Sequence, residues 1–160
     1  MTDFARLMSD YFVKYLAGQK GSGSNTMKTY RDTFVQLLEF MDEKKHIRAD
    51  CIEVDSFSYD IINEFLEYLE KEKRVSISTR NNRLAAIRSF FKYTGYHEPK
   101  YLNISVSIRE ISKKKTGDRQ MNYLSVNAME HFLNSFDKTD HKELRCFCIV
   151  LLLYESGARV

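Results

Sequence analysis

The sequence predicts an all-α fold, on three observations. Its 160 residues contain one proline and six glycines, so long stretches hold no helix-breaking residue. Apolar residues recur in these stretches at three- and four-residue steps, the period of an amphipathic helix. Hydrophobic residues make up 43% of the chain, including 11 Phe and 10 Tyr, which supplies enough apolar surface for a buried core. The length suits one domain or two small ones.

Two helices are predicted near the N-terminus, over residues 3–16 and from Asn25 to about residue 41. Their apolar stripes are Phe4, Leu7, Met8, Tyr11, Phe12 and Tyr15 in the first, and Tyr30, Phe34, Leu37, Leu38 and Met41 in the second. Residues 18–24 are rich in glycine and serine and predict a loop between the two helices. Asn25 suits the N-cap of the second helix, because its side chain can accept a backbone N–H.

The first turns of the second helix carry Lys28, Thr29 and Arg31 on their outer side. The positive end of a helix dipole normally attracts acidic residues, so two cations there are unusual, although Asp32 partly offsets them. An anionic ligand at this end would explain the pattern. The alternative is an ordinary solvated turn.

A third helix is predicted over residues 59–73, and a fourth from a cap at Ser78 or Thr79 to Gly95, a residue type that commonly ends helices. The third helix exposes four acidic residues, Asp60, Glu64, Glu67 and Glu70, which make it a poor surface for nucleic acid. Four amphipathic helices joined by short loops can form a compact bundle.

The fourth helix has two different faces. Leu84, Ile87, Phe91 and Thr94 form an apolar stripe, and Asn81, Ala85, Arg88, Ser89 and Lys92 recur at the same spacing on the other side. No acidic residue occurs from Val75 to His97. Small residues let a helix backbone approach a bulky partner, while Arg, Lys and Asn donate hydrogen bonds to phosphates and base edges. This face indicates an anionic partner, and nucleic acid is the leading candidate.

Charge is segregated along the chain. The formal net charge is only +3, but residues 71–119 contain 13 basic and 4 acidic residues, a net charge of +9 that leaves −6 for the rest. A concentrated basic stretch binds polyanions in a salt-dependent way, because each neutralised phosphate releases counterions. The alternative is that Lys113, Lys114 and Lys115 only solubilise a linker.

The pattern loosens after the fourth helix. Residues 98–121 contain Pro99 and the triple lysine and predict a basic inter-domain linker between a first domain, residues 1–97, and a second, residues 122–160. In the second domain helices are predicted over residues 126–134, capped by Ser125, and over residues 141–155. The last helix is apolar all round, so it is expected to belong to a larger core than these residues can build.

Composition excludes several classes of protein. The chain has no run of about 18 apolar residues that could span a membrane, and its first residues do not resemble a secretory signal. Three cysteines, an odd and sparse set, fit reduced thiols in a cytoplasm. Because no Cys or His pairs occur at ligand spacing, the cysteines are expected to be buried core residues, and no metal site is expected.

Four segments, in this order, resemble the tyrosine recombinase, or phage integrase, family. They are Asn-Thr-Met-Lys-Thr-Tyr at residues 25–30, Ser-Thr-Arg-Asn-Asn-Arg-Leu-Ala-Ala-Ile-Arg-Ser-Phe-Phe at residues 78–91, Tyr-Leu-Ser at residues 123–125 and Leu-Leu-Leu-Tyr-Glu-Ser-Gly-Ala-Arg at residues 151–159. The resemblance implies a small four-helix, SAM-like core-binding bundle that meets DNA, then a linker and the first helices of a truncated catalytic domain.

In this family a tyrosine hydroxyl attacks a DNA phosphodiester and forms a phosphotyrosyl link, without a nucleotide cofactor. The resemblance assigns Arg159 to the first catalytic arginine, whose guanidinium would hold the scissile phosphate. The family's nucleophilic tyrosine, lysine, second arginine and accompanying histidine have no counterpart in these residues. The chain is therefore expected to bind duplex DNA without cleaving it. The residues expected to contact DNA are Lys28, Thr29, Arg31, Arg80, Asn81, Asn82, Arg83, Arg88, Lys92, Lys113, Lys114 and Lys115.

Two other interpretations stay open. A non-enzymatic helical DNA-binding regulator would share the basic face but should end in a closed, polar helix. A protein-interaction module with an acidic partner would also use segregated charge. Self-association is a further expectation, of the parent protein on DNA and of this chain through residues after Met121, because its last helix would expose an apolar face.

Overall fold

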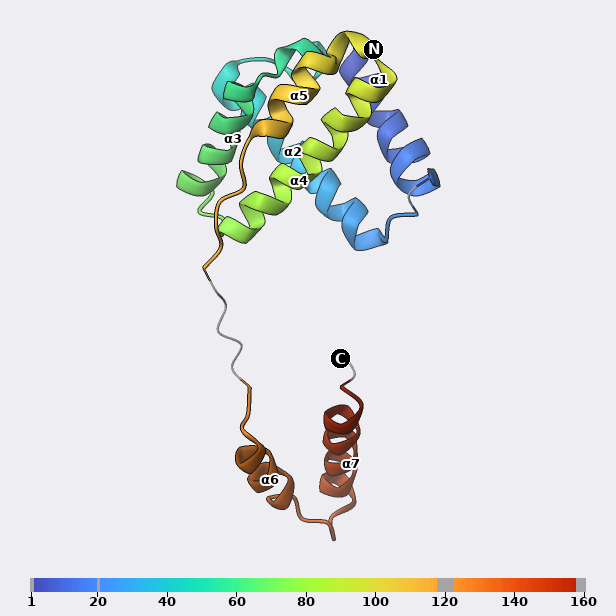
Figure 1. The fold of residues 1–160 in the computed structure, drawn as a ribbon, viewed down its shortest axis with the longest axis vertical. Helices are drawn as coiled ribbons and strands as arrows, with labels where there is room; N and C mark the ends of the chain where they lie inside the picture. The colour runs from blue at the N-terminus through green and yellow to red at the C-terminus, as the bar shows by residue number, and fades with distance from the viewer. Residues whose placement is uncertain (1, 20, 118–122, 158–160) are drawn as a thin grey trace. The chain divides into compact units, whose positions relative to one another are not determined.

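The computed structural model describes residues 2–19, 21–117 and 123–157, and every regular element in these ranges is a helix, so the all-α prediction is confirmed (Figure 1). The chain divides into two compact units, Met1–Gly117 and Asp118–Val160. None of the described helices is both long enough and apolar enough to cross a membrane.

The first unit consists of five α-helices joined by short π- and 3-10 segments. In chain order these are α1 (Asp3–Asp10), the π-helix η1 (Tyr11–Gln19), α2 (Ser24–Lys45), the 3-10 turns η2 (Ala49–Cys51) and η3 (Val54–Ser56), α3 (Tyr59–Lys71), α4 (Ile77–His97), the 3-10 turn η4 (Pro99–Tyr101) and α5 (Leu102–Glu110). The four helices predicted for the bundle are all present, and α5 is a fifth.

Helix N-termini are fixed by side-chain caps that the sequence only partly revealed. Ser76 caps α4 by accepting the backbone N–H of Thr79 at 3.2 Å, so the caps predicted at Ser78 or Thr79 were wrong by two or three residues. The N-cap of α2 is Gly23, which offers no side-chain hydrogen bond, and the predicted cap Asn25 lies inside the helix. A glycine N-cap is tolerated at a cost of only a few tenths of a kcal/mol.

The core of the first unit is aromatic and centres on α4, which packs against α2, α3 and α5. The predicted stripe of Leu84, Ile87, Phe91 and Thr94 is fully buried. Phe90 joins three other elements, with its ring centroid 5.5 Å from Phe4, 5.4 Å from Tyr11 and 5.2 Å from Phe34. Edge-on aromatic pairs of this kind add stability beyond the area they bury.

The prediction that Gly95 ends the fourth helix was wrong. Helix α4 continues to His97 and ends where Glu98 turns to extended backbone before Pro99, because a proline disfavours helical geometry in the residue before it. Gly95 is buried inside the helix, and a Cβ placed on it would lie 2.7 Å from Cβ of Ser105. The missing side chain therefore gives α5 room to approach.

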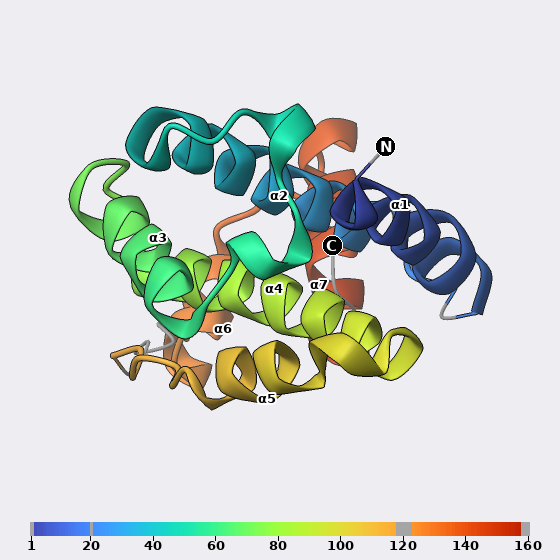
Figure 2. The ribbon, with the colours of Figure 1, turned by 90° about the horizontal axis from the view of Figure 1, so that it is seen from above.

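Residues 98–110, predicted as part of a linker, are almost entirely helical. Helix α5 runs antiparallel along α4 (Figures 1 and 2) and buries Ser105 and Ile108, and Ile111 is buried just beyond its end. The predicted boundary at residue 97 thus differs from the structure, in which the first unit extends to Gly117. Of the apolar residues at 102–111, Ile104, Ile108 and Ile111 are buried or half-buried, whereas Leu102 and Val106 are exposed. A small polar residue, Ser105, packs against Gly95.

The second unit contains two helices, α6 (Val126–Asn134) and α7 (His141–Ser156), close to the predicted ranges. Ser125 caps α6 as predicted, by accepting the N–H of Ala128 at 3.2 Å. Phe136 contacts Phe132 and Phe147 and joins the two helices. No described residue of this unit is fully buried, and Leu152 is 66% exposed.

Candidate nucleic-acid interface

A groove crosses the outer side of α4 in the first unit. It has a volume of about 480 Å³ and is lined by Tyr15, Tyr30, Ala85, Arg88, Ser89, Lys92, Arg109 and Lys113. These residues come from η1, α2, α4 and the C-terminal end of α5 with the segment that follows it. Four of them are cations and none is acidic. We call it the basic groove.

The floor of the basic groove is made of small side chains on α4. Ala85 and Ser89 are half-buried there, so a ligand can come close to the helix. The hydroxyl of the buried Tyr11 donates a hydrogen bond to Oγ of Ser89 at 2.8 Å and fixes that side chain. Burial raises the pKa of the Tyr11 hydroxyl, so the phenol is neutral at physiological pH.

Arg88 holds the end of α5 against α4. One guanidinium nitrogen donates to the carbonyl of Arg109 at 2.6 Å and also to the carbonyl of Ile111. A cation suits these positions because the last carbonyls of a helix lack intrahelical partners. Burial lowers the pKa of Arg88, and the neighbouring cations Arg109 and Arg80 lower it further. A positive charge in this surrounding would be stabilised by an added anion.

Cations without a carboxylate partner are concentrated around the basic groove. Elsewhere on the first unit cations pair with acids, as Lys44 does with Glu72 at 2.9 Å and Lys71 with Glu67 at 2.8 Å. Within described residues 2–19 and 21–117, the cations that have no carboxylate within 4.0 Å are Lys28, Lys73, Arg74, Arg83, Arg88, Lys92, Arg109, Lys113 and Lys115. Lys73 and Arg74 are the exceptions, and each of the other cations was a predicted site residue or lines the groove.

Hydrogen bonds link the first turns of α2 to α4. The Arg83 guanidinium donates to the carbonyl of Thr29 at 3.0 Å and to the hydroxyl of Thr33 at 3.2 Å. The Thr29 hydroxyl donates to the carbonyl of Asn25, inside its own helix. Lys28 and Arg31 are exposed there, and Arg31 has only a long contact, 3.8 Å, with Asp32. These two cations line a separate hollow together with Phe12, Ser24 and Met27.

Other predicted site residues are engaged within the protein. Arg80 is only 5% exposed; it forms an ion pair with Glu70 at 3.2 Å and donates to the carbonyl of Ser112 at 3.1 Å. The Asn81 amide bonds the backbone of Lys114, whose ammonium pairs with Glu70 at 2.7 Å. These contacts leave Arg80 no surface from which to reach a ligand. By contrast, Asn82 and Lys115 are exposed.

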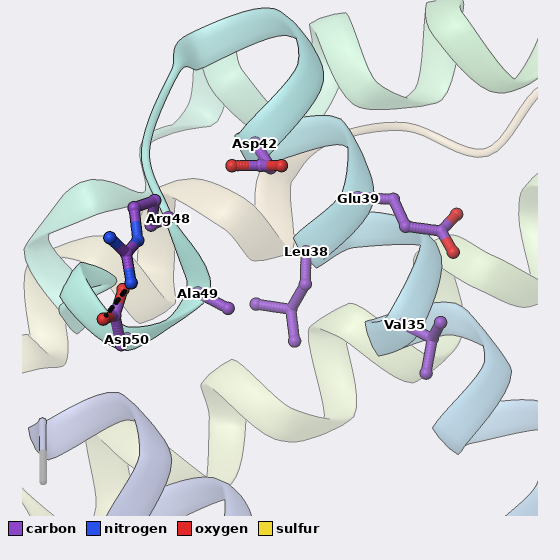
Figure 3. A pocket seen from close by; sticks show the side chains of 7 residues that line it. All are labelled: Val35, Leu38, Glu39, Asp42, Arg48, Ala49 and Asp50. Carbon is purple, nitrogen blue, oxygen red and sulfur yellow. Dashed lines mark hydrogen bonds and ion pairs between the residues drawn. The ribbon is translucent and has the colours of Figure 1, made fainter.

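A second hollow in the first unit has the opposite character (Figure 3). It lies between the C-terminal half of α2 and η2, and its lining includes Glu39, Asp42 and Asp50. The one cation that lines it, Arg48, pairs with Asp50 at 2.9 Å. Like charges would repel a polyanion from this hollow, so it is a poorer surface for a polyanion than the basic groove.

Five groove residues were not among the predicted site residues. Ala85 and Ser89 had been placed on the same helix face as Arg88 and Lys92, whereas Tyr15, Tyr30 and Arg109 were missed. The two tyrosines belong to apolar stripes, which gave no sign that their edges reach the surface. Arg109 lies in the segment predicted as a linker, so its place beside Arg88 depends on a helix that was missed. Its signal was the spacing of Ile104, Ile108 and Ile111.

Sequence predictions were also made for the cysteines, for a metal site and for Arg159. All three cysteines are exposed, so the prediction of buried cysteines was wrong. Among the described residues no cluster of His, Cys, Asp or Glu could hold a metal ion. Arg159, assigned by resemblance to a catalytic arginine, lies outside the described residues.

A helical unit with a basic groove on one face is electrostatically suited to a polyanion. Its family follows from comparison: a sequence model described as "Phage integrase, N-terminal SAM-like domain" matches residues 10–99, more than half of the chain. The chain therefore belongs to the tyrosine recombinase, or phage integrase, family, as its sequence motifs predicted.

Known relatives cover nearly all of the chain. The protein is 27% identical over 98% of its length to y4rC of Sinorhizobium fredii, named as an integrase/recombinase, and 28% identical over 98% to y4rD of the same organism. It is 26% identical over 96% of its length to the tyrosine recombinase XerC of Staphylococcus aureus. These alignments cover 47%, 56% and 48% of the relatives, so the chain spans about half of their length. No solved structure matches it significantly.

Proposed function

We propose that this chain is the duplex-DNA-binding part of a site-specific tyrosine recombinase and that the basic groove contacts the DNA backbone. The observation that carries the proposal is the concentration of cations without carboxylate partners around α4 and the start of α2. A surface that left these charges to water alone would gain little from grouping them, whereas phosphates would neutralise them and release counterions.

The residues proposed to contact phosphates are Lys28, Arg31, Lys92, Arg109 and Lys113, whose side chains are all exposed. The last three line the basic groove, and Lys28 and Arg31 line a separate hollow at the first turns of α2. Ala85 and Ser89 between them allow a close approach of the backbone. Arg88 is proposed to act through its charge, since its hydrogen bonds go to carbonyls at the end of α5. Phosphate contacts position a protein on DNA, and base edges supply its sequence preference.

The proposed chemistry of the parent protein is DNA strand cleavage and rejoining through a phosphotyrosine link. Arg159 is proposed to stabilise the charge that develops on the scissile phosphate, as a bidentate guanidinium donor. The nucleophile and the other charge-stabilising residues of the family have no counterpart in the 160 residues. The chain by itself is therefore proposed to bind DNA without forming a covalent adduct.

Binding of a labelled random duplex, measured by fluorescence anisotropy across a salt series, tests this proposal. Five phosphate contacts predict a slope of log K against log salt of about −4.5, or a roughly 500-fold loss of affinity between 50 and 200 mM salt. A slope near zero would contradict the proposed backbone contacts. A denaturation-resistant protein–DNA adduct would contradict the proposed lack of cleavage.

Self-association is a separate proposal, based on the second unit. Ile149, Leu152 and Tyr154 on α7 are 48%, 66% and 48% exposed, and no described residue of α6 or α7 is buried. Apolar side chains exposed on a single helix favour association. Sedimentation velocity should show concentration-dependent oligomers that Leu152→Glu reduces; a monomer at all concentrations would contradict the proposal.

A further inference from the structure

Asn81 links α4 to the segment after α5 through two hydrogen bonds to Lys114, which we call the pin. Its side-chain Nδ2 donates to the carbonyl of Lys114 at 2.8 Å, and its Oδ1 accepts the Lys114 backbone N–H at 3.1 Å. The backbone N–H and C=O of Lys114 are thus both hydrogen-bonded to the Asn81 side chain. We propose that Asn81 is a positioning residue, which holds this segment so that Lys113 lies in the basic groove. This inference rests on the proposed function.

The pin is the last of a series of contacts along α4. Arg88 binds the carbonyls of Arg109 and Ile111, Arg80 binds the carbonyl of Ser112, and Asn81 binds Lys114. From Arg88 to the Arg80–Asn81 pair the contacts run back along α4, while their partners run forward from Arg109 to Lys114, so the segment runs antiparallel to the helix. Each contact reaches the backbone, and therefore fixes the path of the chain whatever side chains it carries.

The lengths of the two paths agree. Seven residues of helix, from Arg88 back to Asn81, span about 10 Å at about 1.5 Å per residue. Three residues of extended chain, from Ile111 to Lys114, also span about 10 Å at roughly 3.3 Å per residue. The segment can therefore meet its contacts at both ends while extended. Successive side chains of an extended chain point in opposite directions.

This alternation fits the different surroundings of Lys113 and Lys114. The Lys114 ammonium is bound to Glu70 at 2.7 Å, on the α3 side, where Glu70 also pairs with Arg80. Lys113 lines the basic groove with Arg88 and Lys92 and has no carboxylate partner. A pin on the peptide of Lys114 sets which of these neighbouring lysines faces each side. Without it, the charge of Lys113 would be free to leave the groove.

A role for Asn81 as a direct reader of bases fits the structure less well. Both ends of its amide are already used by Lys114, and its Oδ1 also accepts from Arg80 at 3.2 Å. Contact with a base edge would have to replace these bonds. Its neighbour Asn82 is exposed and makes no hydrogen bond within the described residues, so Asn82→Ala is the control for helix propensity and for exchange at Lys114. If Asn82 itself contacts DNA, its loss should add to that of Lys113→Gln.

The test compares Asn81→Ala and Asn82→Ala, each alone and combined with Lys113→Gln, in DNA-binding salt series with the full 160-residue chain. Both alanines favour helix equally, so the pair differs in the hydrogen bonds that Asn81 makes with Lys114 and Arg80. One lost phosphate contact at 0.1 M salt corresponds to roughly an eightfold loss of affinity and a slope change of about 0.9. We expect this from Asn81→Ala alone and from Lys113→Gln alone, but no further loss in their combination.

Hydrogen exchange at the Lys114 amide provides a readout that does not involve DNA. The amide should be protected in the wild type and in Asn82→Ala and should exchange faster in Asn81→Ala. Additive losses for Asn81→Ala and Lys113→Gln, or unchanged exchange, would overturn the positioning role while leaving DNA binding intact. No binding by the wild-type chain would instead overturn the proposed function, and with it any role for the pin in DNA contact.

Discussion

The close packing of α5 on α4 depends on the absence of a side chain at Gly95, and Gly95→Ala should expose this dependence. A Cβ at this position would lie 2.7 Å from Cβ and 2.8 Å from Oγ of Ser105, and 3.6 Å from Cα of Leu102. The first two distances are shorter than carbon and oxygen atoms tolerate, so α5 must move. Ser105 is only 3% exposed, and a change of its rotamer would leave its Cβ in place.

The magnitude is a balance of two effects. Replacing a mid-helix glycine with alanine favours the helix by about 1 kcal/mol, because glycine loses more backbone entropy on folding. Overpacking a close contact costs about 1–3 kcal/mol. The nearest contact is with Cβ of Ser105, which a change of rotamer does not move, so we take the upper part of that range, about 1.5–3 kcal/mol. We therefore expect a net loss of about 0.5–2 kcal/mol in the free energy of unfolding, together with a displaced α5 and weaker bonds from Arg88 to the end of that helix.

Urea denaturation followed by circular dichroism measures this loss, and Gly18→Ala is the control. Gly18 also lies in a helical segment, but a Cβ there would meet only the Val13 carbonyl at 3.6 Å, an ordinary contact. This variant should be unchanged or slightly more stable. A double variant, Gly95→Ala with Ser105→Gly, should recover part of the loss. Equal or increased stability of Gly95→Ala alone would refute the close contact.

The remaining predictions concern the cap of α4 and the groove floor. Ser76→Ala should lower the free energy of unfolding by about 1 kcal/mol because it removes the N-cap, whereas Ser78→Ala should leave it within about 0.5 kcal/mol; equal effects in urea denaturation would contradict this assignment. Tyr11→Phe should cost about 1 kcal/mol at neutral pH through the lost bond to Ser89. Burial raises the pKa of Tyr11, so its neutral form contributes stability that is fully present below its ordinary value of 10.0 and is lost as the pH rises above it. Denaturation between pH 9 and 11, in roughly one-unit steps, should show a smaller alkaline decline in Tyr11→Phe than in the wild type, and parallel declines would count against this.

Helical periodicity was enough to predict most of the fold. The stripe from Leu84 to Thr94 is buried because four apolar side chains at helical spacing cannot all face water. Helix α5 was not predicted because its packing on α4 depends on small residues and not only on an apolar stripe. Ser105 reads as polar in sequence, yet it is buried because Gly95, ten residues earlier, leaves space for it. A pairing of small residues between two helices leaves no periodic apolar signal.

The sequence predicted that α4 carries positive charge on one face, but not which hydrogen bonds its cations make. Sequence placed Arg80, Arg88 and Lys92 on one helix without acids, which located the positive face. It could not show that two of these guanidinium groups bind carbonyls of residues 109–112, because those partners are distant in sequence and are backbone atoms of a helix end. Lys92 is the one of the three whose side chain has no partner among residues 2–19, 21–117 and 123–157.

The most direct test of the central claim is DNA binding by a charge-reversed groove, Lys92→Glu with Lys113→Glu. The matched control is Lys44→Glu with Lys71→Glu, which makes the same change in net charge at two cations paired with acids away from the groove. Anisotropy with a random duplex at 0.1 M salt should show a loss of at least roughly 60-fold for the groove variant, from two lost phosphate contacts, and only a small loss for the control. Equal losses in both variants would mean that net charge alone drives binding, and would contradict the assignment of the basic groove as the DNA-binding surface.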